Sequence, residues 1–449
     1  MTERVYLHVG APKSGTTYLQ AVLRRNRARL ADAGVLVVGE RHLDVVHAGL
    51  VVREDPRVAD LGPRAAAAWE RMVHDIRTWQ GPVAVLSYEL FSGASREQAR
   101  AVLDALDGLE VHLVYSVRDL ARAVPSAWQE RLKFALTAPL HAWTPPAEEA
   151  GSRAEWGWRT MDPVGVLQRW AADLDPSHVH VVTVPRSSGD ATVLWKRFAE
   201  ACDLGAHVRG LDLAVPQTNE SLGPVPAELL RRVNAHLAGE LTTNAQQARW
   251  IRNTLAHEVL VPLGRERLGI TDAQLADAES RSERAIDHLR SSGYDVRGDL
   301  EDVRATRPEG RMPSDVAEAD LLATATEALA RLLLLMRERV TALPAALPAP
   351  TPTPEPEPVE TPAGPTSRQR ARDLAYRVVG HETRRVVDSR LEELEARVRE
   401  LEQQVQEDRA LHRRVAALDD LVCELLLPTA DQDDDVVRRS LAAYHQDSL

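Results

Sequence analysis

The chain has 449 residues, which is enough for one large domain with appendages or for about two or three ordinary domains. Its formal net charge of −12 argues against a general nucleic-acid binder, which needs a basic field, although a local cluster of donors can still hold an anionic small molecule. The two cysteines, Cys202 and Cys423, exclude a disulfide framework, so a reducing cytoplasm is the expected compartment. The first residues lack the pattern of an export signal, and no apolar run reaches the roughly 18 residues of a membrane span.

Residues 5 to about 200 alternate short β-branched runs with longer segments of helical spacing. Nearly continuous apolar runs predict strands covered on both faces at Val5–Val9, Val35–Val38, Val83–Ser87, Val111–Ser116 and Val179–Val184. The intervening segments Thr17–Ala31 and Arg96–Leu106 have helical spacing. This alternation predicts right-handed crossovers, and hence a P-loop-like three-layer α/β fold around a parallel sheet.

After the last predicted strand the pattern is mostly helical, from about residue 218 to 340. The segment Gly293–Leu300 is interpreted as an irregular connection within it. Ser314–Leu343 is predicted to form one long helix that Pro344 ends. We therefore expect a main domain over residues 1–310 and a helical extension over 311–343.

The remaining residues divide into three predicted parts: a proline-rich linker over 344–370, a coiled coil over 371–427 and an acidic tail over 428–449. Nine prolines between residues 344 and 365 predict a semi-rigid spacer. The heptad residues are Leu391, Leu394, Val398, Leu401 and Val405, followed by a second run, shifted in register, from Leu411 to Leu425. An amphipathic helix needs a partner for its apolar stripe. We therefore expect a homo-oligomer or a protein partner, with folding back onto the main domain as the alternative.

The first predicted strand runs directly into the loop Gly10–Thr17, and a helix follows. A glycine-containing loop between a strand and a helix N-terminus can cradle an anion with its backbone N–H groups and the helix dipole. The spacing nearly matches the P-loop, but Thr16 stands where the nucleotide hydrolases have their lysine, and Lys13 comes three residues earlier. A lysine within the loop favours a shorter anion than a nucleoside triphosphate.

The segment Pro12–Thr17 resembles the 5′-phosphosulfate loop of the sulfotransferase superfamily, Pro-Lys-Ser-Gly-Thr-Thr, at every position. The resemblance implies an enzyme that uses 3′-phosphoadenosine 5′-phosphosulfate (PAPS) as co-substrate. It implies that Lys13 contacts the bridging oxygen and stabilises charge on the departing phosphate. It also implies that the 5′-phosphate is held by Ser14, Gly15, Thr16 and Thr17. The alternative is an ordinary strand-to-helix turn with capping residues.

A second segment, Val114–Leu120, resembles the part of the same family that holds the 3′-phosphate. The resemblance implies that Arg118, at the strand end, and Ser126, on the next helix, share this phosphate. A guanidinium fork suits a phosphate dianion. The alternative is a surface arginine paired with Asp119. The resemblance as a whole covers roughly residues 1–310.

Transfer to an acceptor hydroxyl needs a base, and related enzymes place a glutamate or histidine at the end of the third strand. Glu89 is the predicted base; a salt-bridged or capping glutamate is the alternative. His42 and His47, after the second strand, are alternative bases. The sequence has no Cys/His motif, so no metal is predicted. A late loop around Asn219 and Ser221 weakly resembles one that closes over nucleotide or acceptor in the family.

The predicted reaction transfers a sulfuryl group from PAPS to a hydroxyl or amine of a carbohydrate, glycolipid or small metabolite and releases PAP. Two other classes remain open. One is a P-loop kinase or NTPase, which should bind Mg-ATP. The other is a coiled-coil scaffold that carries an inactive sulfotransferase-like domain.

Overall fold

The computed structural model describes residues 1–147, 155–186, 190, 192–205, 210–215 and 221–342. The chain divides into two compact units, Met1–Arg337 and Glu338–Leu449. The predicted linker, coiled coil and acidic tail lie outside the described residues. Among the described helices, none combines the length and apolar character that crossing a membrane requires.

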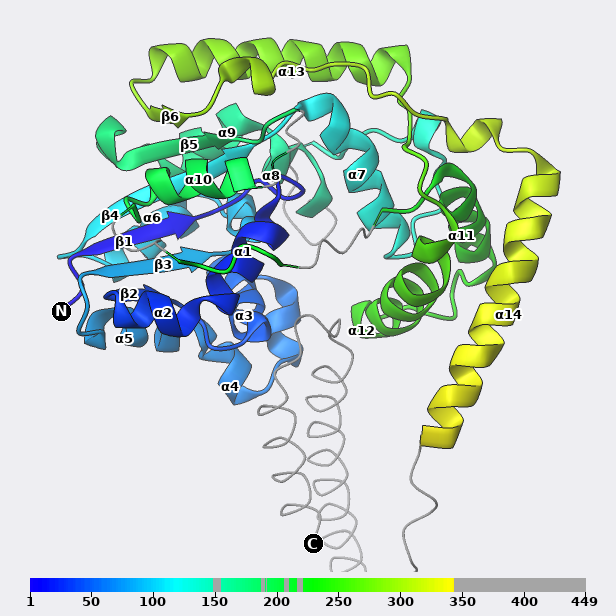
Figure 1. Cartoon of the computed structure of the whole chain (residues 1–449), viewed down its shortest axis with the longest axis horizontal. Coiled ribbons are helices and arrows are strands. Elements are labelled where there is room, and N and C mark those ends of the chain that lie inside the picture. The colour runs from blue at the N-terminus through cyan, green and yellow to red at the C-terminus, as the bar shows by residue number, and fades with distance from the viewer. Residues whose placement is uncertain (148–154, 187–189, 191, 206–209, 216–220, 343–449) are drawn as a thin grey trace, which may run out of the picture. The chain divides into compact units, whose positions relative to one another are not determined.

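The centre of the first unit is a six-stranded sheet in the order β2-β3-β1-β4-β5-β6, with every neighbouring pair parallel (Figure 1). Its strands are β1 (Arg4–His8), β2 (Val35–Val37), β3 (Val83–Ser87), β4 (Glu110–Val117), β5 (Val179–Thr183) and β6 (Asp295–Arg297). The five predicted strands are confirmed. The sequence analysis missed β6, because this short edge strand has only one apolar residue, Val296, and so lacks the apolar run of a buried strand.

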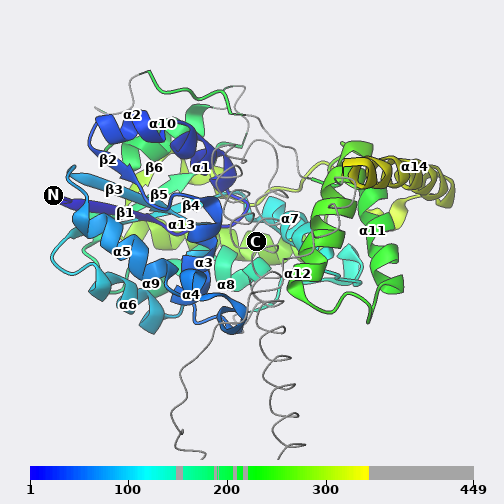
Figure 2. The same ribbon diagram turned by 90° about the horizontal axis from the view of Figure 1, so that it is seen from below.

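Helices cover both faces of the sheet, which confirms the predicted three-layer α/β architecture (Figure 2). One face packs on α1 (Thr16–Arg25), α2 (Arg27–Asp32) and α10 (Thr192–Ala201). The other packs on α3 (His42–Val52), α5 (Ala68–Thr78), α6 (Arg96–Ala105), α9 (Pro163–Trp170) and part of α13 (Asp272–Ser291). Successive residues of β1 alternate between the two cores: Val5 and Leu7 belong to the core that includes α3 and α5, whereas Tyr6 belongs to the core that includes α1 and α10.

The helix predicted over Thr17–Ala31 is two helices, α1 and α2, separated at Asn26. The Asn26 side-chain amide donates to the carbonyls of Val22 and Asp212 at 2.8 Å each, so the residue caps one helix and ties down a later loop. The hydrophobic spacing continues across this break, which explains why the sequence pattern suggested a single helix.

A second, helical core packs against α7 (Leu120–Leu132). It includes α11 (Pro224–His236), the π-helix η6 (Gln247–Leu260), part of α13 and α14 (Glu318–Ala342). The predicted long helix over Ser314–Leu343 is thus largely confirmed, although its first turn is the separate 3-10 helix η9 (Pro313–Asp315). The remaining short helices are α4 (Pro63–Ala66), α8 (Trp158–Met161), α12 (Asn244–Gln246), η1 (Pro56–Asp60), η2 (Glu89–Gly93), η3 (Leu140–Ala142), η5 (Pro176–His178), η7 (Val261–Leu263) and η8 (Leu300–Asp302).

Candidate functional site

The two segments singled out in the sequence meet at the carboxyl edge of the sheet. β1 and β4 are neighbours, but the chain leaves β1 toward β2 on one side and leaves β4 toward β5 on the other. A crevice forms where such connections diverge, and ligands of open α/β sheets bind there. The loop Gly10–Thr17 is held against the end of β4, with the backbone N–H of Ala11 donating to the Ser116 carbonyl at 2.7 Å.

The loop leads into an α1 N-terminus that has no side-chain cap. Gly15 is the N-cap residue, with φ of 82°, and Lys13 also has a left-handed φ of 62°. The Ser14 hydroxyl donates to the Ala11 carbonyl at 2.6 Å, so it braces the loop from within. Ser14 and Thr16 are buried, whereas Thr17 is exposed. The first N–H groups of α1 therefore remain available, together with the positive end of the helix dipole, for an anion.

Arg118 lies against this loop, where its Nη1 donates to the Lys13 carbonyl at 2.7 Å. Burial, helped by the positive charge of Arg122, lowers the pKa of Arg118 to about 10. No carboxylate forms an ion pair with Arg118 in the part of the chain that the structure describes. The Asp119 pairing considered as an alternative is not seen among these residues, since Asp119 caps α7 at Ala121 N (2.9 Å) and accepts from Thr306 Oγ1 at 2.6 Å. Arg118 is thus a partly buried cation with donors to spare beside the loop Gly10–Thr17.

Ser126 lies on α7, eight residues after Arg118, and its hydroxyl donates to the Arg122 carbonyl at 3.0 Å. No hydrogen bond joins it to Arg118 within the described ranges. The late loop reaches the same helix, because the backbone N–H of Leu222 donates to Gln129 Oε1 at 2.7 Å and Ser221 Oγ lies 3.3 Å from the Gln129 side chain. Asn219 lies outside the described residues. Ser126, which is predicted to bind the 3′-phosphate, and Gln129, which contacts the late loop, therefore lie three residues apart on α7.

The sequence analysis missed Glu130, a buried carboxylate on α7. Lys13 Nζ donates to Glu130 Oε1 at 2.8 Å, and Lys133 Nζ donates to the same oxygen at 3.0 Å. Arg252 Nε lies 4.0 Å from the second carboxylate oxygen. Burial opposes ionisation, but the neighbouring charges of Lys13, Lys133 and Arg252 outweigh it and hold the pKa of Glu130 well below its usual value. The scarcity of lysine, which occurs only at three positions, was the signal that could have drawn attention to Lys133.

His257 belongs to the same cluster and was also missed. It lies five residues after Arg252 on the π-helix η6, in which hydrogen bonds join residues five apart, and both side chains lie near Glu130 and Lys133. Burial, together with the charges of Lys133 and Arg252, lowers the pKa of His257 to about 2. Its Nε2 is buried and has no hydrogen-bond partner among the described residues. A neutral imidazole with an unused nitrogen therefore lies beside the Lys13–Glu130 pair.

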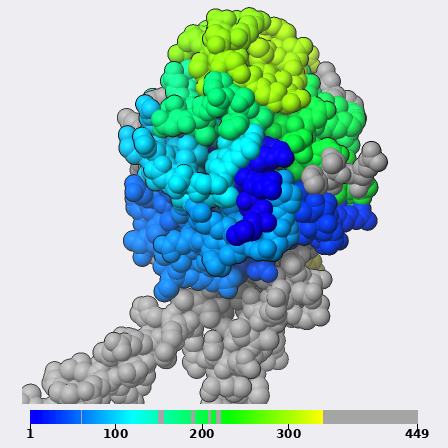
Figure 3. All heavy atoms as spheres, turned by 90° about the vertical axis from the view of Figure 1, so that its left-hand side faces the viewer, coloured from blue at the N-terminus to red at the C-terminus, as the bar shows by residue number. Residues whose placement is uncertain are grey.

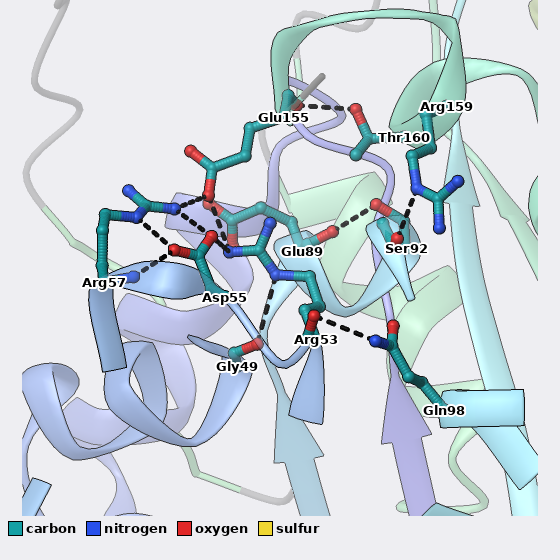
Figure 4. Close-up of polar contacts among 11 residues, drawn as sticks. Gly49, Arg53, Asp55, Arg57, Glu89, Ser92, Gln98, Glu155, Arg159 and Thr160 are labelled. Carbon is teal, nitrogen blue, oxygen red and sulfur yellow. Dashed lines mark hydrogen bonds and ion pairs between the residues drawn. The ribbon is translucent and has the colours of Figure 1, made fainter. Parts of the chain in front are cut away.

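Glu89 is the first residue of η2, directly after β3, at the predicted end of that strand. Its Oε2 accepts from Gln20 Nε2 of α1 at 2.8 Å, and its backbone carbonyl accepts from the Ser92 hydroxyl at 2.7 Å (Figure 4). The same carbonyl lies so close to Gly10 that a Cβ there would approach it to 2.6 Å. Glu89 therefore borders the loop Gly10–Thr17 (the anion loop), and among the described residues its carboxylate is held by an amide rather than by a salt bridge.

The two alternative bases lie on α3. His42 Nδ1 lies 3.4 Å from Arg24 Nη1, and His42 lines a small pocket together with Gln20 and Ser87. His47 is half-buried on the same helix. His42 thus shares the neighbour Gln20 with Glu89.

A charged network lies beside Glu89, as Figure 4 shows. Arg53 Nη2 lies 2.6 Å from Glu155 Oε1, Arg57 Nε lies 2.7 Å from Asp55 Oδ1, and Arg57 also pairs with Glu155. Burial opposes ionisation of Asp55, but the hydrogen bonds from Arg57 outweigh it and lower the pKa of this carboxyl. Two arginines and two carboxylates therefore form a charge-balanced wall.

This wall borders a cavity of about 520 Å³. Arg57 and Glu155 line it together with the aromatic rings of Phe134 and Trp156, and hydroxyl and amide groups complete the lining at Thr137, Thr242, Asn244 and Gln247. Aromatic faces with a few polar groups are typical of sites for polar organic molecules. The cavity is thus a candidate site for an acceptor.

Comparison with known proteins identifies a family model that matches the C-terminal stretch. Residues 394–448 match a domain of unknown function (DUF6752), and this stretch lies outside the described residues. No curated protein and no solved structure gives a significant match to the chain. The comparisons therefore concern the C-terminal stretch, and the candidate site stands on its own geometry.

Proposed function

We propose that the chain is a PAPS-dependent sulfotransferase. The observation that carries the proposal is the meeting of the uncapped α1 N-terminus, Lys13 and the partly buried Arg118 at one point of the sheet edge. PAPS carries a 5′-phosphosulfate and a 3′-phosphate, so it needs two separate anion sites. The loop Ser14–Thr17 provides N–H donors for the first, and Arg118 with Ser126 provides donors for the second.

In the proposed reaction the acceptor oxygen attacks the sulfur in line, and the bond between sulfur and the bridging oxygen breaks. PAP leaves with the electron pair of that bond, and Lys13 stabilises the charge that develops on its 5′-phosphate. Glu89 takes the acceptor proton. The product is a sulfate ester, or a sulfamate where the acceptor is an amine.

Lys13 is available for this role only when it turns from Glu130 toward the ligand. Its ion pair with Glu130 involves one partly exposed partner, since the Lys13 side chain is 27% exposed and that of Glu130 is 3% exposed. Lys133 also pairs with Glu130, so this carboxylate keeps a counterion when Lys13 leaves. The arrangement therefore favours movement of Lys13 on binding of an anion.

The cavity lined by Phe134 and Trp156 supports a polar organic acceptor such as a carbohydrate, the head of a glycolipid or a small metabolite. Aromatic rings stack on apolar faces of such molecules, and hydroxyl and amide groups bind their hydroxyls.

The decisive experiment is calorimetric titration of the purified full chain with PAP, Mg-ATP and adenosine 5′-phosphosulfate. We expect PAP to bind best and its affinity to fall by about 10-fold or more in Arg118→Ala, because hydrogen bonds to a charged group are worth about 1.5–3 kcal/mol. Arg284→Ala, on an exposed residue of α13, is the matched control. Tighter binding of Mg-ATP would favour a P-loop kinase or NTPase, and absence of nucleotide binding would favour the scaffold.

A further inference from the structure

A second cluster lies at the amino edge of the sheet, away from the anion loop. Glu110 and His112 are two residues apart on β4, and His178 and His180 are two residues apart at the start of β5. Side chains two apart on a strand share a face. The parallel register pairs Leu113 with Val179, so His112 lies beside His178 in the neighbouring segment.

Three possible ligand atoms converge here, and all lie within 4.8 Å of one another. Glu110 Oε1 lies 2.8 Å from His112 Nε2 and 3.8 Å from His178 Nε2. A tetrahedral Zn²⁺ ion with bonds of about 2.0–2.1 Å separates its ligands by roughly 3.3 Å, a value between these two distances. Small side-chain movements are therefore enough to close the site around an ion.

The outer partners of this cluster form a hydrogen-bonded chain. His112 Nδ1 lies 2.8 Å from His180 Nε2, and His180 Nδ1 lies 2.7 Å from Asp295 Oδ2. Asp295 Oδ2 also accepts from Arg297 Nε at 2.9 Å, so this carboxylate acts as an acceptor. The carboxylate therefore orients His180 with its hydrogen on Nδ1, and His180 Nε2 in turn accepts from His112 Nδ1.

When both imidazole rings are neutral, one contact of this hydrogen-bonded series lacks a hydrogen. The contacts Glu110–His112, His112–His180 and His180–Asp295 need three hydrogens, whereas two neutral imidazole rings supply two. With both rings oriented by Asp295, the lone pair of His112 Nε2 faces the Glu110 carboxylate at 2.8 Å. Two acceptors at this distance need a positive charge between them, either the third proton of an imidazolium or a metal ion, and His178 offers a third ligand atom at the same point.

We propose that Glu110, His112 and His178 bind a divalent transition-metal ion, for which Zn²⁺ is the best match by ligand type. Two imidazoles and one carboxylate are an established zinc set, with water in the fourth position. His180 and Asp295 orient His112 from outside, as carboxylate and histidine partners of metal ligands do.

The site is open to solvent, since the side chains of Glu110 and His178 are 48% and 35% exposed. Figure 3 shows the face of the molecule on which the amino ends of the strands emerge. Bound metal would cross-link β4 to the turn before β5.

The eight residues of β4 separate Glu110 from the start of the proposed anion site by roughly 25 Å, so this inference is independent of the proposed transferase.

The test is calorimetric titration of Zn²⁺ into tag-free, chelator-treated full chain, with thermal unfolding recorded in parallel. We expect one Zn²⁺ per chain and a higher midpoint of unfolding with the metal. Glu110→Gln and His178→Ala, which change partly exposed side chains, should each weaken binding at least 10-fold. Asp295→Asn should weaken Zn²⁺ binding by about 10- to 100-fold, because Asp295 orients His180 and His180 in turn orients the ligand His112.

His74→Ala, which removes an exposed histidine of α5, is the matched control and should bind Zn²⁺ as the unchanged chain does. Cobalt gives a second measurement, because Co²⁺ bound by nitrogen and oxygen ligands absorbs visible light, and this absorption should disappear in His178→Ala. The proposal is overturned if the chain binds no Zn²⁺ at 100-fold molar excess. It is equally overturned if Glu110→Gln and His178→Ala bind the ion unchanged, since the metal then lies elsewhere.

Discussion

Lys13 Nζ and Glu130 Oε1 form an ion pair of 2.8 Å between the anion loop and the middle of the molecule's second core. The two residues are 117 positions apart in the sequence. Lys133 donates to the same oxygen at 3.0 Å from within that core, and Arg252 approaches from η6. Three positive side chains surround one carboxylate in this cluster, and their surplus positive charge favours binding of an anion, such as the proposed phosphosulfate, beside Lys13.

The first prediction concerns the buried part of this cluster. Glu130→Gln removes the carboxylate to which the fully buried Lys133 donates, so the free energy of unfolding should fall by about 3 kcal/mol. The double variant Glu130→Gln, Lys133→Met should lose less, because the buried ammonium group is then absent as well. Urea unfolding of the single and double variants measures both values, with the exposed Glu279→Gln as control. An equal loss in Glu279→Gln, or no loss in Glu130→Gln, would contradict the ion-pair account.

The second prediction concerns the turn at Gly15. An alanine there must keep a φ of 82°, and its Cβ would lie 2.4 Å from Leu194 Cδ2. Gly108 has a similar φ of 84° but open space around the Cβ position. Gly108→Ala should therefore lower the free energy of unfolding by about 1–2 kcal/mol through the backbone alone. Gly15→Ala should lose about 1–3 kcal/mol more, through the clash.

Denaturant unfolding of the two variants measures this difference. In the background Leu194→Ala, where the clashing methyl group is absent, the extra loss in Gly15→Ala should shrink. A loss that stays the same in that background would show that contact with Leu194 is not its cause.

The third prediction concerns pH. His8 is buried between β3 and β4, where Ser87 Oγ lies 2.8 Å from its Nδ1 and Ser116 Oγ lies 2.7 Å from its Nε2. Burial lowers its pKa to about 3. The unfolded chain, in which a histidine has a pKa of about 6.5, therefore binds more protons between pH 6.5 and 3. The free energy of unfolding should fall as the pH drops through this range, by up to about 5 kcal/mol for this one group.

Urea unfolding between pH 7 and 5 measures the slope, which should be about 1.4 kcal/mol per pH unit from His8 below pH 6. His257 contributes in the same direction, since burial lowers its pKa to about 2. His8→Gln should flatten the slope by the His8 contribution, whereas His74→Ala should leave it as it is. An unchanged slope in His8→Gln would mean that His8 does not carry the effect.

The fourth prediction separates the two proposed phosphate sites. Ser126→Ala should weaken PAP by several-fold and leave 5′-AMP unchanged, because only PAP has the 3′-phosphate and one hydrogen bond is worth about 0.5–1.5 kcal/mol. Thr17→Ala, at the 5′ side, should weaken both ligands by a similar factor. Calorimetric titration of both variants with both nucleotides gives the four affinities. Equal weakening of PAP and 5′-AMP by Ser126→Ala would remove Ser126 from the 3′-phosphate site.

The fifth prediction concerns the heptad segment outside the described residues. Leu394→Glu with Leu401→Glu places charges in the predicted apolar seam. The full chain should then change from an oligomer to a monomer in light scattering after size-exclusion chromatography. A monomeric unchanged chain would favour the alternative in which this segment folds back.

The sequence by itself determined the first five strands, because apolar runs between turn residues are a local property of the chain. It also located the turn Gly10–Thr17 between β1 and α1, since Gly15 and the residues around it specify a strand-to-helix turn within a few positions. It did not reveal Glu130, His257 or the cluster around His112, because their chemistry depends on partners far away in the sequence. His112 and His180 are 68 positions apart, and only the register of β4 against β5 brings their rings together. Likewise, Glu130 reads as an ordinary polar residue of α7, and only packing of η6 and the anion loop against that helix buries it among cations. Local patterns record which faces of an element are apolar, whereas burial and charge at a site are set by the other elements that pack there.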